Sequence, residues 1–426
     1  MKILLFTHIF PYPLNEGGKV AQFGILEYLC KENEIVLVVE ESYPNIWDDA
    51  KSLQAILPSL RIKILKATKQ NQPKGIVNAL LKKINKLQWI LQKEVNKHLP
   101  NQSSISDNPF FIYPTRPRKP DVINQLAEVL EMENPDLVQV DFIDNADIVN
   151  LLSAKVKKVL VHHDLRYASV LQACTLQKET VVCSNYLSSY VQTIEAGFLN
   201  KFDAVVTFSK DDKNKLSVLV TKPVIEAIPF PANEKNIPTI ANEPFTIKKL
   251  IFIGPHYHYP NYDAIAWYAK EMAETIFKKY KLPLVVIGNW TASSRQAFDH
   301  VEGITFAGYV DDLQVAMEDA IMITPLRIGS GIRSKLLDAF VYGVPVISTT
   351  VGCEGLGAIA NEELLIADNA ADFFRAIEQL LMDKMLVQKL RVNANQFVRE
   401  NYSHDKVGER RMALYNRLVS ETIDPV

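Results

Sequence analysis

Short apolar runs of strand length alternate with stretches of helical pattern along almost the whole chain, and this rhythm occurs twice. The first series has runs at 3–6, 35–39, 137–140, 159–162 and 203–208. The second series has runs at 250–253, 284–287, 321–325, 344–348 and 364–366. Strands that alternate with helices form parallel sheets covered by helices on both faces. The pattern therefore predicts an α/β fold with two Rossmann-like doubly wound domains that face a cleft.

A proline-rich, irregular passage at 228–245 separates the two series and is typical of a linker. A chain of 426 residues is also longer than one hydrophobic core usually serves. We expect domains at 1–235 and 248–405, joined by a linker at 236–247. The remaining residues, 406–426, are expected to form a C-terminal helix that can cross back to the N-terminal domain.

The composition is that of an ordinary globular protein, with 48% hydrophobic and 23% charged residues. No window reaches the ~18 uninterrupted apolar residues of a membrane-spanning helix, and the apolar run at 1–7 is interpreted as a strand, not as a signal peptide. The cysteines are scattered without a CxxC pair, which favours free thiols in a reducing compartment. A net charge of −2 gives no indication of nucleic acid binding. We therefore expect a cytoplasmic protein with no nucleic acid partner.

One segment, 70–119, fits the strand and helix rhythm poorly and is expected to be an insertion or a mobile loop. It overlaps a basic stretch in which Glu94 is the single acid, and apolar residues recur there at helical spacing over 75–98. This pattern predicts a basic amphipathic helix. The helix either packs on its own domain with a solvated lysine face or docks onto an anionic membrane surface, with Trp89 at the interface. The second alternative would place the protein on the inner face of the plasma membrane.

The most informative stretch is 325–356, with the sequence PLRIGSGIRSKLLDAFVYGVPVISTTVGCEGL. Gly329 and Gly331 form a predicted turn at the start of a helix. A helix N-terminus presents free N–H groups and the positive end of the helix dipole, so it binds anions. Arg333 and Lys335 fall in the first turn, where cations are unfavourable unless an anion is present. These features indicate a diphosphate site, although paired glycines also occur in turns that bind nothing.

About two turns further along, Asp338 can accept hydrogen bonds from a ribose diol. With the Gly-Val-Pro-Val-Ile strand at 343–347, the stretch resembles the family-4 retaining glycosyltransferases, which have the glycosyltransferase-B architecture. The family's signature has two acids eight positions apart. The second acid matches Asp338, whereas the first falls on Ser330, and the turn from Gly329 to Arg333 resembles a GxGxR subgroup without that acid. The family's role for that first acid, which grips the sugar hydroxyls, is therefore not carried over to Ser330.

The resemblance extends over nearly the whole chain. PYPLNEGGK at 11–19 resembles the family's glycine loop beside the donor phosphates, with a plain strand-to-helix turn as the alternative. GPHYHYPNYD at 254–263 resembles the opening of the second domain in the same subgroup, including a Pro-Asn pair. In VLVHHD at 159–164, His163 matches a family histidine near the reacting carbon better than His162 does.

The resemblance implies that His163, Arg333 and Lys335 are catalytic. Glu354, in the loop after a strand, is expected either to contact the donor or to cap its loop. The implied donor-binding residues are Gly17, Gly18, Gly254, Asn261, Tyr309, Val310, Arg327, Gly329, Ser330, Gly331, Ile332, Leu336, Asp338 and Glu354. No metal or other cofactor is expected, because Arg, Lys and helix N–H groups can neutralise a leaving diphosphate.

The function implied is retaining transfer of a sugar from a UDP- or GDP-linked donor to a glycan, lipid-linked or other hydroxyl acceptor, in synthesis of cell-surface polysaccharide or glycoconjugate. Two alternatives stay open. One is an epimerase or hydrolase of sugar nucleotides on the same fold. The other is a catalytically silent scaffold that keeps the nucleotide pocket, which only Ser330 favours. A Rossmann oxidoreductase is disfavoured, because no GxGxxG follows the first strand.

Overall fold

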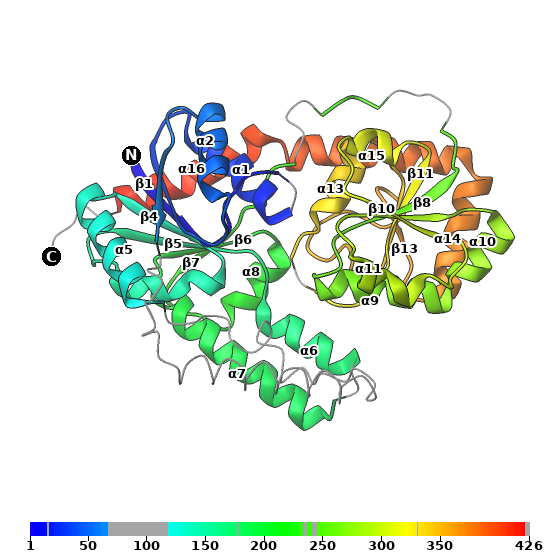
Figure 1. Cartoon of the computed structure of the whole chain (residues 1–426), viewed down its shortest axis with the longest axis horizontal. Helices are drawn as coiled ribbons and strands as arrows, with labels where there is room; N and C mark the ends of the chain where they lie inside the picture. The colour runs from blue at the N-terminus through cyan, green and yellow to red at the C-terminus, as the bar shows by residue number, and fades with distance from the viewer. Residues whose placement is uncertain are drawn as a thin grey trace, which may run out of the picture.

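A computed structural model describes residues 1–14, 17–66, 118–176, 179–232, 237–240, 245–329 and 331–421. It contains two α/β domains, each built on one parallel sheet (Figure 1). The predicted fold class is therefore confirmed. The predicted basic helix over 75–98, nearly all of the segment 70–119, and Ser330 lie outside the described residues.

The N-terminal sheet has seven parallel strands in the order β3-β2-β1-β4-β5-β6-β7. The strands are β1 (Lys2–Thr7), β2 (Glu34–Glu40), β3 (Arg61–Leu65), β4 (Leu137–Asp141), β5 (Lys157–His162), β6 (Ala204–Thr207) and β7 (Val224–Ala227). The order reverses between β1 and β4, so the loops after these strands part and leave room for a ligand. Helices that accompany this sheet are α1 (Gly17–Leu29), α2 (Ile46–Ile56), α5 (Pro120–Glu133), η2 (Ile143–Leu151), α6 (Arg166–Leu176), α7 (Val181–Leu199) and α8 (Lys210–Ser217).

The C-terminal sheet has six parallel strands in the order β10-β9-β8-β11-β12-β13. Its strands are β8 (Lys249–Ile253), β9 (Leu284–Ile287), β10 (Ile304–Gly308), β11 (Ala320–Thr324), β12 (Val346–Ser348) and β13 (Leu365–Ile366). Its helices are α9 (Tyr259–Glu271), α10 (Ala273–Tyr280), α11 (Ala292–Arg295), η3 (Gln296–Phe298), α12 (Leu313–Met317), α13 (Ser334–Val341), α14 (Ala370–Met382) and α15 (Lys384–Asn401). The order reverses between β8 and β11, so this domain has a second ligand-binding position of the same kind.

The last helix, α16 (His404–Ser420), runs back along the N-terminal domain and packs on α1 (Figure 1). The contact is close at Gly408, where an added Cβ would lie 2.3 Å from the ring of Tyr28. Arg411 and Tyr415 of α16 are fully buried. One apolar cluster contains residues of both domains and of α16, so the helix joins the two halves of the molecule.

No helix in the described part of the chain combines the length and the apolar character that crossing a bilayer requires. Three strands, β3, β7 and β10, are absent from the pattern of apolar runs and were missed by it. Each lies at an edge of its sheet and carries half-buried or exposed positions. An edge strand is covered on fewer sides, so its sequence lacks the continuous apolar run of a central parallel strand.

Candidate functional site

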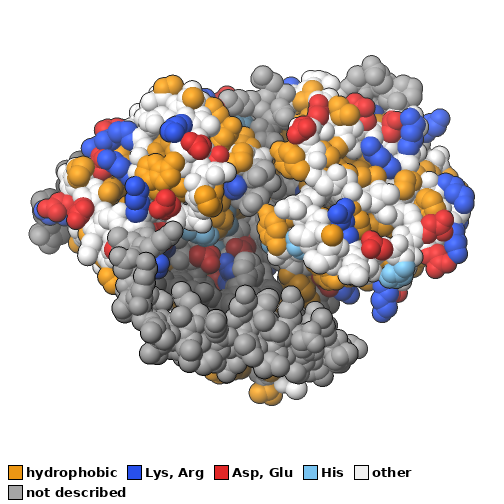
Figure 2. Space-filling model, viewed as in Figure 1, with side chains coloured by type: hydrophobic (Ala, Val, Ile, Leu, Met, Phe, Trp, Pro, Cys, Tyr) orange, Lys and Arg blue, Asp and Glu red, His pale blue; other side chains and the backbone are white. Residues whose placement is uncertain are grey.

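The loops at the carboxyl ends of the two sheets meet in a hollow between the domains. Figure 2 shows this hollow, with histidine and charged side chains in its depth. Polar contacts between described residues cross it. The Nζ of Lys215 donates to Oε1 of Glu354 at 2.5 Å, and the N–H of Gly329 donates to Oε1 of Gln172 at 2.6 Å. The predicted anion-binding turn therefore lies against α6 of the N-terminal domain.

The turn before α13 depends on glycine at two positions. Gly329 has φ of +128° and Gly331 has φ of +77°, which are conformations that residues with a Cβ avoid. A Cβ on Gly331 would also lie 2.7 Å from the backbone oxygen of His163. The N-terminus of α13, an eight-residue helix, is thereby brought beside the end of β5 in the other domain.

Arg333 stands at the N-cap of α13 without a side-chain cap. Its Nη1 donates to the backbone oxygen of Gly331 at 2.5 Å, so the guanidinium folds back over the turn. Burial lowers the pKa of Arg333, and Glu354 and Asp212 oppose that change. The guanidinium is thus held at the positive end of a helix, which is favourable when an anion binds there.

Lys335 follows in the first turn of α13. Its Nζ donates to Oδ1 of Asn261 at 2.8 Å and lies 4.2 Å from the centre of the Phe252 ring. Burial, and then the charge of Arg333, lower the pKa of Lys335 to about 7. A buried ammonium beside a second cation is electrostatically unfavourable until an anion joins it. The pair is therefore suited to hold a diphosphate.

Asn261 is held in turn by the loop after β8. It is buried, and its Nδ2 donates to the backbone oxygen of Pro255 at 3.0 Å. Gly254 has φ of +154°, and an added Cβ there would lie 2.5 Å from the Asn261 amide. The glycine therefore allows this loop to close over Asn261, which places the amide oxygen against Lys335.

His163 directly follows β5, and its Nε2 lies 3.3 Å from Oδ1 of Asp141 at the end of β4. The ring of Phe142 stacks on it with centroids 3.6 Å apart. Gly18, near the start of α1, lies beside Phe142, since an added Cβ would be 3.5 Å from that ring. The predicted glycine loop and the predicted catalytic histidine are therefore neighbours.

His162 lies in a different environment. It is buried within the domain, 3.7 Å from the carboxylate of Glu195, and burial lowers its pKa to about 4. Glu195 accepts hydrogen bonds from the backbone N–H groups of Arg166 and Tyr167. His162 therefore has a structural position, which leaves His163 as the histidine nearer the cleft.

Other predicted residues are brought to the site to different degrees. Arg327 is occupied by a two-bond ion pair with Asp263, at 3.0 and 2.6 Å. Ile332 and Leu336 are buried in the apolar core, so their side chains face away from any polar ligand. The remaining positions are half-buried Asp338 on α13, Glu354 paired with Lys215, and exposed Tyr309 with half-buried Val310 after β10.

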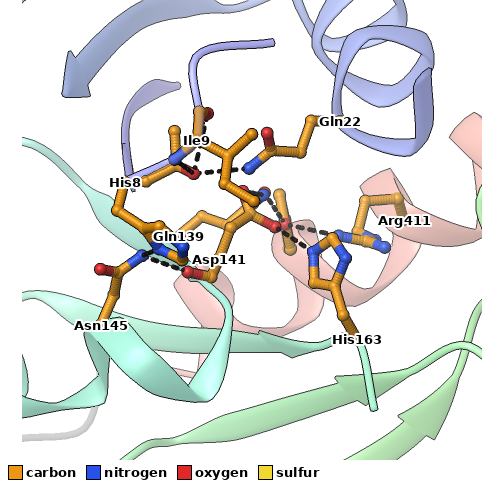
Figure 3. A network of polar contacts seen from close by, with 10 residues as sticks. His8, Ile9, Gln22, Gln139, Asp141, Asn145, His163 and Arg411 are labelled. Carbon is orange, nitrogen blue, oxygen red and sulfur yellow. Dashed lines mark hydrogen bonds and ion pairs between the residues drawn. The ribbon is translucent and has the colours of Figure 1, made fainter. Parts of the chain in front are cut away.

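Four polar side chains at the site were not predicted as functional. Asp141 is the last residue of β4, Asn145 lies in η2 shortly after it, and His8 follows β1 (Figure 3). The Nδ2 of Asn145 lies 3.0 Å from Nδ1 of His8 and 2.6 Å from the backbone oxygen of Asp141. The fourth, His258, precedes α9, and desolvation, then the charges of Lys335 and Arg333, lower its pKa to about 4. All four residues follow apolar runs of strand length, and this position at or after the end of a strand was the signal in the sequence that could have identified them.

Asp164 adds a negative charge opposite these cations. Burial acts to raise its pKa, but Arg166 and then His162 hold the pKa of the carboxyl below its usual value. Its charge also acts on His258 and Arg333 of the other domain. The described residues contain no group of three or more His, Cys, Asp or Glu side chains arranged to hold a metal ion.

Residues 247–383, about a third of the chain, match the protein family described as "Glycosyl transferases group 1". One curated relative, an uncharacterized 44.6 kDa protein in the cps region of Klebsiella pneumoniae, is 25% identical over 225 residues. That match covers 49% of this chain and 55% of the relative, so the chain spans about half the length of this relative.

Solved structures resemble the chain over almost its whole length. Sucrose-phosphate synthase from Thermosynechococcus elongatus has a TM-score of 0.66 at 13% identity, covering 99% of each chain. HepE from Anabaena in complex with UDP-glucose has a TM-score of 0.63 at 10% identity, covering 98% of this chain and 100% of that one. TarM from S. aureus, in complex with Fondaparinux, alpha-GlcNAc-glycerol and UDP, has a TM-score of 0.64 at 13% identity, covering 97% and 99%.

These likenesses show the fold, which is the two-domain glycosyltransferase-B architecture. The family match lies on the domain that contains Asn261, Arg333 and Lys335. The match of the C-terminal domain and the fold of the whole chain together support a glycosyltransferase.

Proposed function

We propose that this chain is a retaining, metal-independent glycosyltransferase of the family-4 type that uses a UDP- or GDP-linked sugar. The observation that carries the proposal is the pair Arg333 and Lys335 at the N-terminus of α13, with the pKa of Lys335 lowered to about 7. Two cations this close, one of them hydrogen-bonded to Asn261, are suited to a diphosphate. The HepE structure contains UDP-glucose and the TarM structure contains UDP, so UDP is the first nucleotide to test.

In the proposed reaction the bond between the anomeric carbon and the diphosphate oxygen breaks, and negative charge grows on the leaving diphosphate. Arg333, Lys335 and the N–H groups at the start of α13 stabilise that charge without a metal ion. The acceptor oxygen forms a bond to the anomeric carbon on the face that the diphosphate leaves and gives its proton to the departing diphosphate oxygen, so the anomeric configuration is retained. Asp338 is assigned to accept hydrogen bonds from the ribose hydroxyls, and His163 is assigned to contact the transferred sugar. No protein nucleophile is needed.

The acceptor is proposed to be a glycan or lipid-linked hydroxyl, in cell-surface polysaccharide or glycoconjugate synthesis. The acceptor would enter from the N-terminal domain, where the loops after β1, β4 and β5 surround His163. We place the protein in the cytoplasm, in reach of the inner face of the membrane. Contact with an anionic membrane through residues 75–98 stays a prediction from the sequence.

The test is release of free nucleotide from UDP- and GDP-sugars in the presence of EDTA, followed by chromatography. Slow hydrolysis by water reports the donor site even when the acceptor is unidentified. We expect turnover with one nucleotide class, lost in Lys335→Ala and kept in Lys248→Ala, whose exposed side chain pairs with Asp319 on the surface. Proton NMR of the first sugar released reads the anomeric configuration.

Three outcomes contradict parts of the proposal. An inverted anomer excludes the retaining reaction. Conversion of the donor to a different UDP-sugar, without nucleotide release, indicates an epimerase. Tight nucleotide binding without any turnover of donor or added glycan acceptors favours the silent scaffold.

A further inference from the structure

The ring of His163 is held on several sides by side chains of its own domain. Asp141 contacts Nε2 at 3.3 Å, Phe142 stacks on one face at 3.6 Å between centroids, and Phe208 meets the ring edge-on at 4.7 Å. Only 9% of the His163 side chain and 3% of the Asp141 side chain are exposed. These contacts hold the ring in one orientation relative to β4. A histidine on the protein surface does not need to be held so closely.

The backbone at Phe142 is strained. Its φ of +68° and ψ of 141° form a combination that residues with a Cβ avoid, and such a residue costs about 1–3 kcal/mol. Its N–H donates to the backbone oxygen of Val161 at 3.0 Å, which ties it to β5. Consecutive residues of a strand point to opposite faces, yet Asp141 and Phe142 both contact the ring of His163. The unusual backbone conformation allows this double contact.

Asp141 is itself held by a buried chain of hydrogen bonds that reaches α16 (Figure 3). Its Oδ2 accepts from Nε2 of Gln139 at 2.9 Å. The amide oxygen of Gln139 accepts from the hydroxyl of Tyr415, and Nη1 of Arg411 donates to that hydroxyl at 3.4 Å. All four side chains are at least nine-tenths buried. In this series of hydrogen bonds, every bond is donated in the direction of Asp141.

The direction of these bonds fixes the proton on His163. A carboxylate can only accept hydrogen bonds, so a ring nitrogen that bonds to Asp141 must carry the proton. That nitrogen is Nε2, which leaves Nδ1 with its lone pair in the neutral ring.

We propose that Asp141 is the positioning residue of His163, and that Gln139, Tyr415 and Arg411 hold Asp141 in place. The arrangement fixes the neutral Nε2–H tautomer of His163 and makes Nδ1 an acceptor for a sugar hydroxyl. The role toward a sugar rests on the proposed function, whereas the tautomer does not. The C-terminal helix α16 is thereby part of the support of the site.

The tautomer is measured on full-length protein labelled with 15N-histidine, with His163 assigned by the signals lost in His163→Gln. The spectra are recorded at pH 8.5, where the neighbouring His8, His162 and His258 are neutral because their pKa values are lowered. We expect the wild type to show Nε2 as the protonated nitrogen and Nδ1 as the bare one.

In Asp141→Asn the two nitrogen shifts should move toward each other, because an amide can donate or accept and no longer selects one tautomer. Tyr415→Phe should produce a smaller movement in the same direction, since it removes one hydroxyl and keeps the ring. Tyr268→Phe, at a buried tyrosine of the other domain, is the control and should leave His163 unchanged. Because Tyr415→Phe is the milder change, it still provides the comparison when Asp141→Asn fails to fold.

A wild type with the proton on Nδ1 overturns the proposal, and so do folded Asp141→Asn and Tyr415→Phe variants with unchanged His163 shifts. On donor turnover, Asp141→Asn should lower kcat about tenfold or more, with KM for the donor within about twofold. A rise in KM for the donor as large as the fall in kcat would instead indicate that Asp141 acts in donor binding, and it would overturn the positioning role. A fixed tautomer in a protein that turns over no nucleotide sugar supports positioning and contradicts the proposed function.

Discussion

At the scale of the residue, the side chain with the clearest electrostatic signature is Lys335. Its ammonium lies in a buried place next to Arg333, and its pKa is lowered to about 7 from an ordinary value of 10.5. Near neutral pH it is therefore partly neutral before a ligand binds. An anion that binds beside it favours the charged form and raises this pKa.

This gives a prediction for the pH dependence of nucleotide binding. Above pH 7 the free protein loses the proton that the complex needs, so affinity for UDP should fall as pH rises. We expect a fall of about tenfold or more between pH 7 and pH 9 by calorimetry, because each pH unit above the pKa can change binding up to about tenfold. Lys335→Arg should bind with little change over this range, since arginine keeps its charge. A wild-type affinity that is constant to pH 9 would show that Lys335 does not contact the ligand.

Gly331 provides a second prediction at this scale. Alanine there would suffer an unfavourable φ of +77° and a Cβ 2.7 Å from the oxygen of His163. Gly357 has a similar φ of +81° but nothing within 4 Å of an added Cβ, so it is the matched control. Gly357→Ala should lower the free energy of unfolding by only about 1–2 kcal/mol, the cost of the backbone strain alone. Gly331→Ala should unfold at a lower denaturant concentration than the control and bind UDP more weakly. Equal stability and equal UDP affinity of the two variants would mean that the turn at Gly331 does not pack closely against the N-terminal domain.

At the scale of the element, the contact of α16 with α1 is testable through two helical glycines. Gly408→Ala would bring a Cβ to 2.3 Å from the Tyr28 ring, whereas Gly197 in α7 has nothing within 4 Å. Alanine in an open helical position stabilises a protein by about 0.5–1 kcal/mol relative to glycine. Gly197→Ala should therefore raise the free energy of unfolding, and Gly408→Ala should lower it. Both are read by chemical denaturation, and stabilisation by both would show that α16 does not pack closely on α1.

The elements also show what the sequence could predict. The central strands were predictable because β1, β4, β5, β8 and β11 are largely buried and have apolar runs, interrupted in β4 only by Gln139. The edge strands β3, β7 and β10 were not, since exposure breaks those runs. The turn before α13 was predictable from its glycines and cations, which lie close together in sequence.

The partners of His163 could not be predicted in the same way. Asp141 lies on the neighbouring strand, and Tyr415 comes from α16 at the far end of the chain. Only the strand order and the return of α16 bring these residues together. Asp141 also occurs in an unremarkable LVQVD strand, where a polar residue at the end is common. The pairing of Arg327 with Asp263 was hidden for the same reason, since the two residues approach only in the folded domain.

At the scale of the whole molecule, the two domains are joined across the hollow by the ion pair of Lys215 with Glu354. The pair is partly exposed, with 39% and 23% of the side chains accessible, so its own contribution is modest. Reversing one charge adds repulsion. Glu354→Lys should increase the radius of gyration in small-angle X-ray scattering, and the double variant Lys215→Glu with Glu354→Lys should restore it. No increase in the single variant would show that the domains are held together without this pair.

The proposed function requires the N-terminus of α13, with Arg333 and Lys335, to bind the diphosphate of a nucleotide. The most direct measurement compares the affinities of UDP and uridine at pH 7 in EDTA by calorimetry, in the wild type and in Lys335→Ala. We expect the wild type to bind UDP at least about a hundredfold more tightly than uridine, since two charge-assisted contacts are each expected to contribute about 1.5–3 kcal/mol. In Lys335→Ala this preference should fall by about tenfold or more. An equal preference in the two proteins, or none in the wild type, would contradict a diphosphate site at the N-terminus of α13.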